Sequence, residues 1–460
     1  MTSNSGLRRL EPSMSVKAAR LVVALAAGLA LVSCAPSTGS KTTGAGGDQG
    51  SGSGTVKMVL WPGPEGEAMG KVVEAYNAGQ GAKDKIKVEM TLLSRQDTFS
   101  KEATLMAAKS SQQDIYFVAS YNVGQYANSL DPLTSVDASN YFPVAVNGLK
   151  YQDKQYALPL DVSNHFLLYR KDLLDALLAA KSQWPAYAAV ASKAIGEKRD
   201  PKPAAEWDWN DYIAMAAWFS KSANPSSPTQ YGTILQAKNL LYNTMIWDDV
   251  LWGQGGSWTT PEGKANLDSP AAVKAVGVYS TIYKNGWTSK DSSQAEFPET
   301  QAALKAGKTA FALQWSAGFA ELNDKTKSPL VAGKIAIAPV PGQKTHVHAL
   351  AVALNKYSEN KGAATKFLDY LATPDAMTAY AKAGGIPAMP DVLKANMSIN
   401  PAFGQISESI DKYGYSVPVF PNTFQAYSKI AESLSGAWVG QQDAATALKT
   451  ANASLQKLLG

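Results

Sequence analysis

Strand-like and helix-like segments alternate from residue 55 onward, and this order restricts the fold more than any other feature of the chain. Apolar runs and alternating patterns predict strands at 55–61, 85–93 and 114–118. Helical spacing of apolar residues predicts helices between them, at 67–77 and near 98–108. Strands that alternate with helices are typical of an α/β fold with a mostly parallel sheet flanked by helices.

The carboxyl ends of the predicted strands are the expected ligand-facing edge, because open α/β sheets bind ligands beyond that edge. Trp61 ends the first strand, and residues 120–122 follow the third. Farther along, "FLLYRKDLLDALL" (166–178) begins as a strand and continues as a helix. The pairs Ser269-Pro270 and Thr373-Pro374 each predict a capped helix start, with proline in the first turn.

The first 33 residues have the composition of a secretory leader. Basic residues at 8, 9, 17 and 20 precede an almost entirely apolar run, 21–32, and the small Ser33. About 12 apolar residues are too few to cross a bilayer, which takes roughly 20. We therefore interpret 1–33 as a signal peptide rather than a membrane-spanning helix, with Met14 as an alternative start.

Cys34 is the single cysteine among 460 residues. The sequence "LVSC" that ends on it resembles a bacterial lipobox, in which the cysteine is acylated and becomes the mature N-terminus. The alternative is an ordinary secretory signal with a chance cysteine near its end. Residues 34–54 are mostly Gly, Ser, Thr and Ala and predict a flexible tether. With one cysteine, no disulfide can form within the chain, so the fold depends on its core.

The composition favours a binder of neutral polar ligands. The chain has 11 Trp and 20 Tyr, but its charged residues amount to 18% and it has three His. Removal of 1–33 takes away four basic residues and one acidic residue, so the net charge falls from +5 to +2. This small charge and the absence of Lys/Arg runs argue against nucleic-acid binding.

No catalytic or metal-binding constellation is evident in the sequence. His346 and His348 would share one face of a strand, but His165 is the single further histidine, and no acidic or cysteine cluster completes a metal site. No G-x-S-x-G motif supports a Ser-His-Asp triad. Asp248 and Asp249 are adjacent, so they cannot flank a glycosidic bond at the roughly 5–10 Å that glycosidases need. We therefore expect no metal, no cofactor and no catalytic residues.

Three tryptophans lie close together at 247, 252 and 258. They fit either core packing or a platform for the apolar face of a sugar ring, and the sequence leaves both readings open. Asn243 and Gln254 lie nearby and supply amides that suit sugar hydroxyls.

Several motifs, taken in order, resemble one family. They include "DIYFVASYNVGQYANSLDPLT", "YALPLDVSNHFLLYRKDLL", "EWDWNDYIAMAAWF", "LWGQGGSW", "ALKAGKTAFALQWSAG", "IAPVPG" and "LATPDAMTAYAKAGGIPA". From residue 55 to 460 the chain resembles the extracellular solute-binding proteins of carbohydrate ABC transporters, of the maltose-binding-protein type. It departs from the family pattern at Arg170, where Asn is usual, and at Phe311, where Met is usual.

The resemblance implies a two-lobe periplasmic-binding-protein fold with the ligand cleft between the lobes. The N-terminal lobe would comprise 55–160 plus 346–386, and the C-terminal lobe 161–345 plus 387–460. The implied ligand contacts come from loops of both lobes and from the crossover between them. They are Trp61, Glu65, Ser120, Tyr121, Asn122, Asp161, Ser163, Asn164, Asn243, Trp247, Gly255, Gly256, Trp315, Phe424 and Tyr427.

The implied function is capture of a sugar or oligosaccharide outside the cytoplasm and its delivery to the permease subunits of an ABC transporter. The protein would be a monomer, anchored to the cell membrane through Cys34, and would not be an enzyme. Two alternatives stay open. One is a binding protein for another solute, such as a polyol phosphate, a polyamine or a peptide. The other is a secreted carbohydrate-active enzyme. The expected cleft loops contain one nearby cation, Arg95, which favours a neutral ligand.

Overall fold

The structure is a computed structural model, and it describes residues 52–134 and 136–460. The predicted signal peptide, Cys34 and nearly all of the tether lie outside the described residues. Among the described residues, no helix combines the length and the apolar character needed to cross a membrane.

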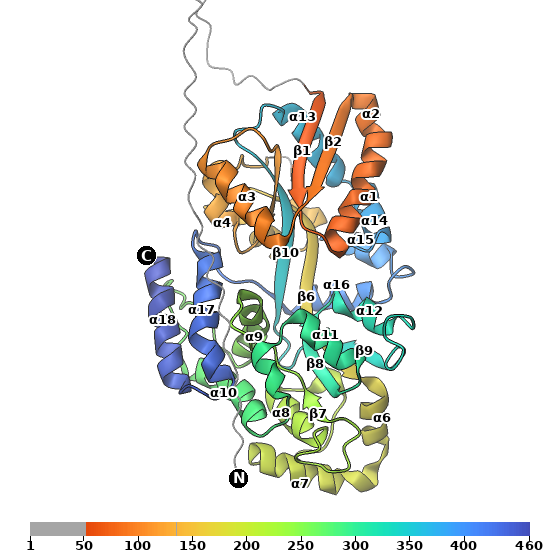
Figure 1. Cartoon of the computed structure of the whole chain (residues 1–460), viewed down its shortest axis with the longest axis vertical. Helices are drawn as coiled ribbons and strands as arrows, with labels where there is room; N and C mark the ends of the chain where they lie inside the picture. Colours follow the sequence, from red (N-terminus) through yellow and green to blue (C-terminus); the bar gives the residue numbers. More distant parts are fainter. Residues whose placement is uncertain (1–51, 135) are drawn as a thin grey trace, which may run out of the picture. The chain divides into compact units, whose positions relative to one another are not determined.

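The described chain is an α/β protein, as predicted (Figure 1). Its strands are β1 (Gly54–Leu60), β2 (Ile86–Leu92), β3 (Ile115–Ala119), β4 (Lys150–Tyr151), β5 (Lys154–Gln155), β6 (Leu158–Arg170), β7 (Tyr231–Thr233), β8 (Thr309–Trp315), β9 (Ile335–Ala338), β10 (Thr345–Leu354) and β11 (Gly414–Tyr415). The helices of the first half are α1 (Pro64–Ala78), α2 (Gln80–Asp84), α3 (Arg95–Ala107), α4 (Val123–Tyr126), α5 (Pro143–Asn147), α6 (Lys171–Ala179), α7 (Trp184–Ile195) and α8 (Trp209–Trp218). Those of the second half are α9 (Leu241–Gly253), α10 (Pro270–Lys284), α11 (Phe297–Lys305), α12 (Gly318–Asn323), α13 (Lys361–Leu371), α14 (Pro374–Lys382), α15 (Pro390–Ala395), α16 (Ala402–Tyr413), α17 (Thr423–Trp438) and α18 (Ala444–Leu459).

Two long strands, β6 and β10, connect the two parts of the sheet. The strand order is β2-β1-β3-β10-β6-β8-β7, with β9 also paired to β6 and β11 to β10. The two strands pair antiparallel from Val352 opposite Leu158 to Val347 opposite Asn164. On its other side β10 pairs with β3 over Leu350–Leu354, and beyond Asn164 β6 continues along β8 and β9. Figure 1 shows both strands running from the β1–β2 region to the β7–β9 region, so each belongs to both lobes.

Parallel pairing is found at the two ends of the sheet, as the alternation of strands and helices predicts. The pairs β1–β2, β1–β3 and β7–β8 are parallel. The crossing strands add antiparallel pairs with β3, β8 and β9, and the sequence pattern did not reveal these pairs. Helices such as α1, α3 and α13 pack near the β1–β2 end, whereas α8, α11 and α12 pack near the β7–β9 end.

The predicted element boundaries agree closely with the structure. The segment 166–178 changes from β6 to α6 between Arg170 and Lys171. The hydroxyl of Ser269 accepts a hydrogen bond from Ala272 N–H and so caps α10. Thr373 caps α14 in the same way.

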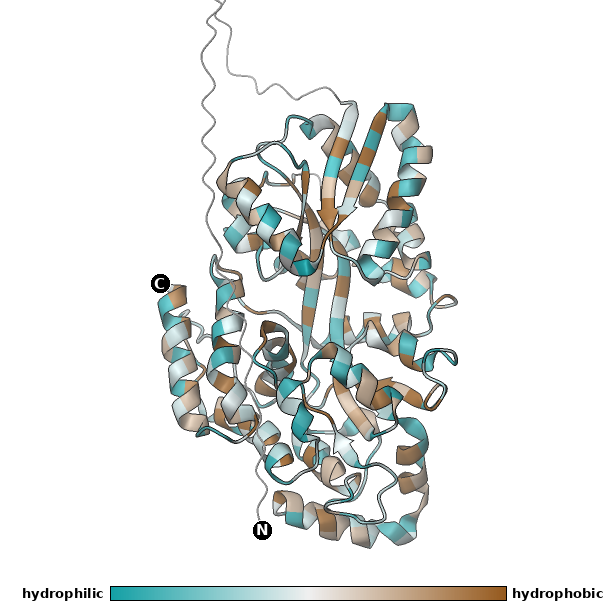
Figure 2. Ribbon diagram, viewed as in Figure 1, coloured by the Kyte–Doolittle hydropathy of each residue, from teal (hydrophilic) through white to brown (hydrophobic). Residues whose placement is uncertain are grey.

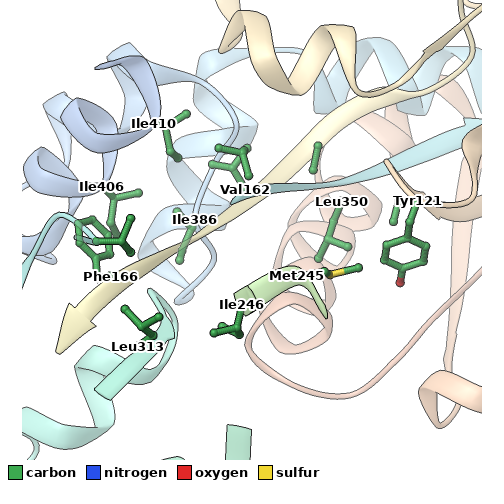
Figure 3. Close-up of a cluster of buried hydrophobic side chains, with 14 of the residues drawn as sticks. Tyr121, Val162, Phe166, Met245, Ile246, Leu313, Leu350, Ile386, Ile406 and Ile410 are labelled. Carbon is green, nitrogen blue, oxygen red and sulfur yellow. The ribbon is translucent and has the colours of Figure 1, made fainter. Parts of the chain in front are cut away.

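The core continues through the crossing strands rather than stopping at them. β10 is buried along its whole length, and β6 is buried except at its last two residues. Figure 2 shows strongly hydrophobic segments on the strands and mixed hydropathy on the helices. Figure 3 shows buried side chains from both crossing strands packed with those of neighbouring elements, among them Val162, Phe166, Leu350, Met245, Leu313 and Ile406.

All three histidines of the chain lie on the crossing strands, and all are buried. The rings of His165 and His346 stack at 5.6 Å, and those of His346 and His348 at 6.4 Å. His165 Nδ1 lies 2.8 Å from the Asp249 carboxylate, whose other oxygen accepts a hydrogen bond from the His346 backbone N–H. Neither ring nitrogen of His346 has a hydrogen-bond partner among the described residues. Burial is the main cause that lowers the pKa of all three imidazoles well below the usual value.

These neutral imidazoles should make the protein less stable in mild acid. An unfolded histidine takes up a proton near pH 6.5, so the stability from burying a neutral ring is lost as the pH falls below that value. His346→Phe keeps a ring at the site but removes one such group. Chemical denaturation of wild type and variant should show a shallower loss of unfolding free energy for the variant between about pH 6.5 and 5. The expected difference is up to about 1.4 kcal/mol per pH unit. Burial raises the pKa of Asp249, which acts in the opposite direction, but this group is present in both proteins. Equal slopes would contradict the prediction.

Candidate ligand-binding site

A cavity of about 420 Å³ lies where loops from both ends of the sheet meet the crossing strands. The loop after β1 and the start of α1 contribute residues 61–65, and the first residue of α3 contributes Arg95. The crossing strands supply its inner wall through Ser163, His348 and Leu350. The opposite wall comes from α9, α11, α12 and the end of β8. Its residues are Tyr242, Glu296, Phe297, Pro298, Trp315, Ala317, Gly318, Glu321 and Lys327.

Trp315 is the aromatic ring best placed to contact a ligand. It ends β8, lines the cavity and is partly exposed. On its inner side its ring meets His165 edge-on at 4.1 Å and also contacts His346 and His348. The histidine stack therefore supports Trp315 from within the sheet.

Trp61 lies on the opposite wall and is almost fully buried, with 2% of its surface exposed. Its ring packs edge-on against Phe117 at 4.4 Å and Phe99 at 5.6 Å. The guanidinium of Arg95 lies over the Trp61 ring at 5.0 Å and over the Tyr242 ring at 4.8 Å. The cavity thus contains a cation held between aromatic rings of opposite walls.

Two carboxylates face the cavity from opposite walls. Glu65 lies in the first turn of α1, and Glu296 is the N-cap residue of α11. Burial raises the pKa of both groups, whereas the positive charge of Arg95 lowers it. A third carboxylate, Glu321, is paired with Lys305 at 2.7 Å. Carboxylates in this setting can accept hydrogen bonds from ligand hydroxyls.

Four residues that the resemblance implied as ligand contacts line the cavity: Trp61, Glu65, Ser163 and Trp315. The others lie behind it or elsewhere. Tyr121 is one layer behind, where its ring stacks on that of His348 at 5.0 Å and lies 5.6 Å from the Phe424 ring. Ser120 and Asn122 belong to the same turn, in which the side chain of Asn122 accepts a hydrogen bond from Ala119 N–H.

The crossover residues Asp161 and Asn164 are buried and bound within the protein. Asp161 accepts hydrogen bonds from the Tyr380 hydroxyl at 2.9 Å and from Ile386 N–H at 2.8 Å. Burial, with the charge of Glu65, raises the pKa of Asp161 well above its usual value. The amide of Asn164 donates to Ser409.

The predicted residues of the second lobe are also engaged in packing. The amide of Asn243 donates to the carbonyl oxygens of Lys238 and Ala295. Trp247 is fully buried against Trp438. Three predicted residues remain. Gly255 and Gly256 follow the end of α9, and Tyr427 packs against Trp258 in the core.

Three further residues line the cavity that were not predicted to do so: Tyr242, Glu296 and His348. Tyr242 adjoins the predicted Asn243 on α9, but the helical turn directs the two side chains to different surroundings. His346 and His348 lie two residues apart on β10 and so share one face of the strand, as predicted. That the cavity reaches His348 is evident only from the three-dimensional structure. Glu296 gives no motif signal beyond its place at a helix start.

Comparison with solved structures supports the fold. Maltose-bound MalE3 of T. maritima aligns with a TM-score of 0.72 at 22% identity, covering 88% of this chain and 99% of that chain. An ABC transporter solute-binding protein of Thermotoga lettingae, bound with α-D-tagatose, aligns with a TM-score of 0.71 at 21% identity, covering 89% and 100%. The GacH receptor of Streptomyces glaucescens, solved unliganded and with acarbose, aligns with a TM-score of 0.69 at 18% identity, covering 88% and 98%. The two-lobe α/β fold is therefore confirmed.

Sequence comparisons identify the family. A probable ABC transporter-binding protein of Deinococcus radiodurans is 26% identical over 278 residues, which are 58% of this chain and 60% of that protein. A putative binding protein of Brucella abortus is 22% identical over 312 residues, which are 66% of this chain and 68% of that protein. The chain thus spans about 60% of the length of the first of these relatives. The family model for bacterial extracellular solute-binding proteins matches residues 71–405. The chain belongs to the bacterial extracellular solute-binding protein family.

Proposed function

We propose that the protein captures a sugar or oligosaccharide outside the cytoplasm and delivers it to the permease of an ABC transporter. The observation that carries the proposal is the cavity, which residues of both lobes and both crossing strands line together. An aromatic ring with neighbouring carboxylates suits a sugar, because the ring binds its apolar face while the oxygens bind its hydroxyls. The solved relatives with maltose, tagatose and acarbose support this ligand class.

In this proposal Trp315 is the stacking ring, and Glu65, Ser163, Glu296 and His348 bind hydroxyl groups. Trp61 also lines the cavity, and the other residues of the predicted set lie behind it or elsewhere. The charges around the cavity favour a neutral ligand over a phosphate, since three carboxylates face two cations, Arg95 and Lys327.

We place the lobes at 55–160 plus 346–386 and at 161–345 plus 387–460. The crossing strands β6 and β10 then serve as hinges, and the lobes close over the ligand by bending there. In this proposal the protein binds its ligand without turning it over and requires no cofactor, which its membership of a solute-binding family supports.

We also propose that the mature protein is a monomer that Cys34 anchors to the cell membrane through acyl chains. The leader and the "LVSC" sequence support this location. Metabolic labelling with palmitate tests it, since Cys34→Ala should lose the label that wild type carries.

A thermal-shift screen tests the ligand class. The panel should contain mono- and oligosaccharides, polyols, polyol phosphates, polyamines and peptides. A ligand at 100 times its Kd adds about 2.7 kcal/mol to the unfolding free energy, so a true sugar ligand should raise the melting temperature by several degrees. The same sugar should be recovered unchanged after long incubation. Stabilisation by a non-sugar alone, or the appearance of cleaved product, would contradict the proposal.

Substitution of two tryptophans should separate binding from packing. Trp315→Ala should weaken affinity for the sugar found in the screen by about fivefold or more, because an aromatic contact contributes about 1 kcal/mol. Trp247→Ala should instead lower the unfolding free energy by about 3–5 kcal/mol, since it removes a fully buried ring. Titration calorimetry and chemical denaturation of both variants make the comparison. Normal affinity in a folded Trp315→Ala protein would show that this ring does not contact the ligand.

A further inference from the structure

We propose that Arg95 is a positioning residue that clamps the two walls of the cavity together and holds the lobes closed before a ligand arrives. Its guanidinium lies 5.0 Å from the centre of the Trp61 ring and 4.8 Å from that of the Tyr242 ring. Both distances are within the range of a cation–π contact, which extends to about 6 Å. The inference rests on the proposed closing of two lobes, but its test needs no ligand.

The two rings belong to different ends of the sheet. Trp61 follows β1, and Phe99 and Phe117 fix its ring within the β1–β3 end of the molecule. Tyr242 lies in the first turn of α9, a helix that packs against α10, α17 and β10. A side chain that contacts both rings therefore joins two walls that otherwise could move apart.

Arg95 is suited to this role because its charge is permanent and its planar group can contact a ring on each face. It is the first residue of α3, next to the cap residue Ser94. Within the described part of the chain it forms no salt bridge, so the ring contacts hold its guanidinium in place. Its charge also stabilises the ionised forms of Glu65 on one wall and Glu296 on the other.

The same contacts give Trp61 a role different from that of Trp315. Arg95 covers a face of the Trp61 ring, whereas the Trp315 ring has no cation over it among the described residues. Trp61 thus serves as the anchor of the clamp, and Trp315 is the ring left for the ligand.

The test measures the opening of the cleft in ligand-free protein. Spin labels at Lys71→Cys on α1 and Lys325→Cys after α12 are placed in the full chain with Cys34→Ala, which leaves no other cysteine. Both positions are exposed and lie near opposite walls of the cavity. Pulsed electron paramagnetic resonance then gives the distribution of distances between the labels, and its short and long components report closed and open molecules.

Each exposed cation–π contact shifts an equilibrium by about two- to fivefold. Arg95→Met keeps an apolar side chain but loses both contacts. Only the contact with Tyr242 joins the two lobes, so the ratio of open to closed molecules should rise by about two- to fivefold. Tyr242→Leu loses the same contact between the lobes and should raise the ratio to a similar extent, about two- to fivefold. The double variant should match Arg95→Met alone, because Tyr242 contributes through Arg95. Lys101→Met, which removes an exposed cation from the same helix, is the matched control and should match wild type.

The clamp would be overturned by a wild-type distribution with no closed component or by an Arg95→Met distribution equal to that of wild type. Additive effects of the two substitutions would also overturn it. The exposed position of Arg95 predicts normal folding of the variant, which its melting temperature checks. If Arg95→Met fails to fold, comparison of the label distances in Tyr242→Leu and Lys101→Met still tests the clamp. A distribution in Tyr242→Leu equal to that of wild type would contradict it. This test is independent of the proposed sugar binding. The clamp can be detected in ligand-free protein even if the protein binds no sugar.

Discussion

The antiparallel pairing of β6 with β10 is the interaction on which the rest of the structure depends. Six residue pairs join the strands, and each strand then pairs with neighbours at one end of the sheet. A third segment lies alongside β6, where Val162 N–H donates to the Ile386 carbonyl and Ala388 N–H donates to the Leu160 carbonyl. Because these crossings are strands with buried side chains, they join the two lobes through a continuous core. Bending at such a connection can move the lobes without exposing either core.

The same strands supply the inner wall of the cavity. Ser163 and His348 are opposite each other in the β6–β10 pairing, and both line the cavity. His165 lies on β6 opposite Trp315 of β8, so the strand register places the candidate stacking ring directly against the histidine stack. Binding and bending are thus proposed for the same residues, which explains how a ligand could favour closure. A ligand shifts such an equilibrium only through contacts that differ between the open and closed states.

The sequence predicted the elements well because their signals are local. Apolar runs placed β1 and β3, and alternation placed β2, each within a residue or two, and the Ser269 and Thr373 caps marked α10 and α14. The antiparallel pairs of the crossing strands could not be predicted from local patterns, since the pairing joins segments about 180 residues apart. Two other contacts could not be predicted for the same reason. One is the packing of Trp247 against Trp438, and the other is the contact of Arg95 with Trp61 and Tyr242. Motif order brought four residues of the predicted ligand set to the lining of the cavity, but the set also includes residues whose polar groups bind the protein itself, such as Asp161 and Asn243.

Small-angle X-ray scattering tests the central claim, that two lobes hinged on β6 and β10 close around a sugar. The scattering curve of the protein is recorded without ligand and with a saturating amount of the sugar that gives the largest thermal shift. The account predicts that the radius of gyration falls on binding, because open molecules in the ligand-free mixture become closed. Superimposable curves, from a protein shown by calorimetry to be saturated with the sugar, would contradict it.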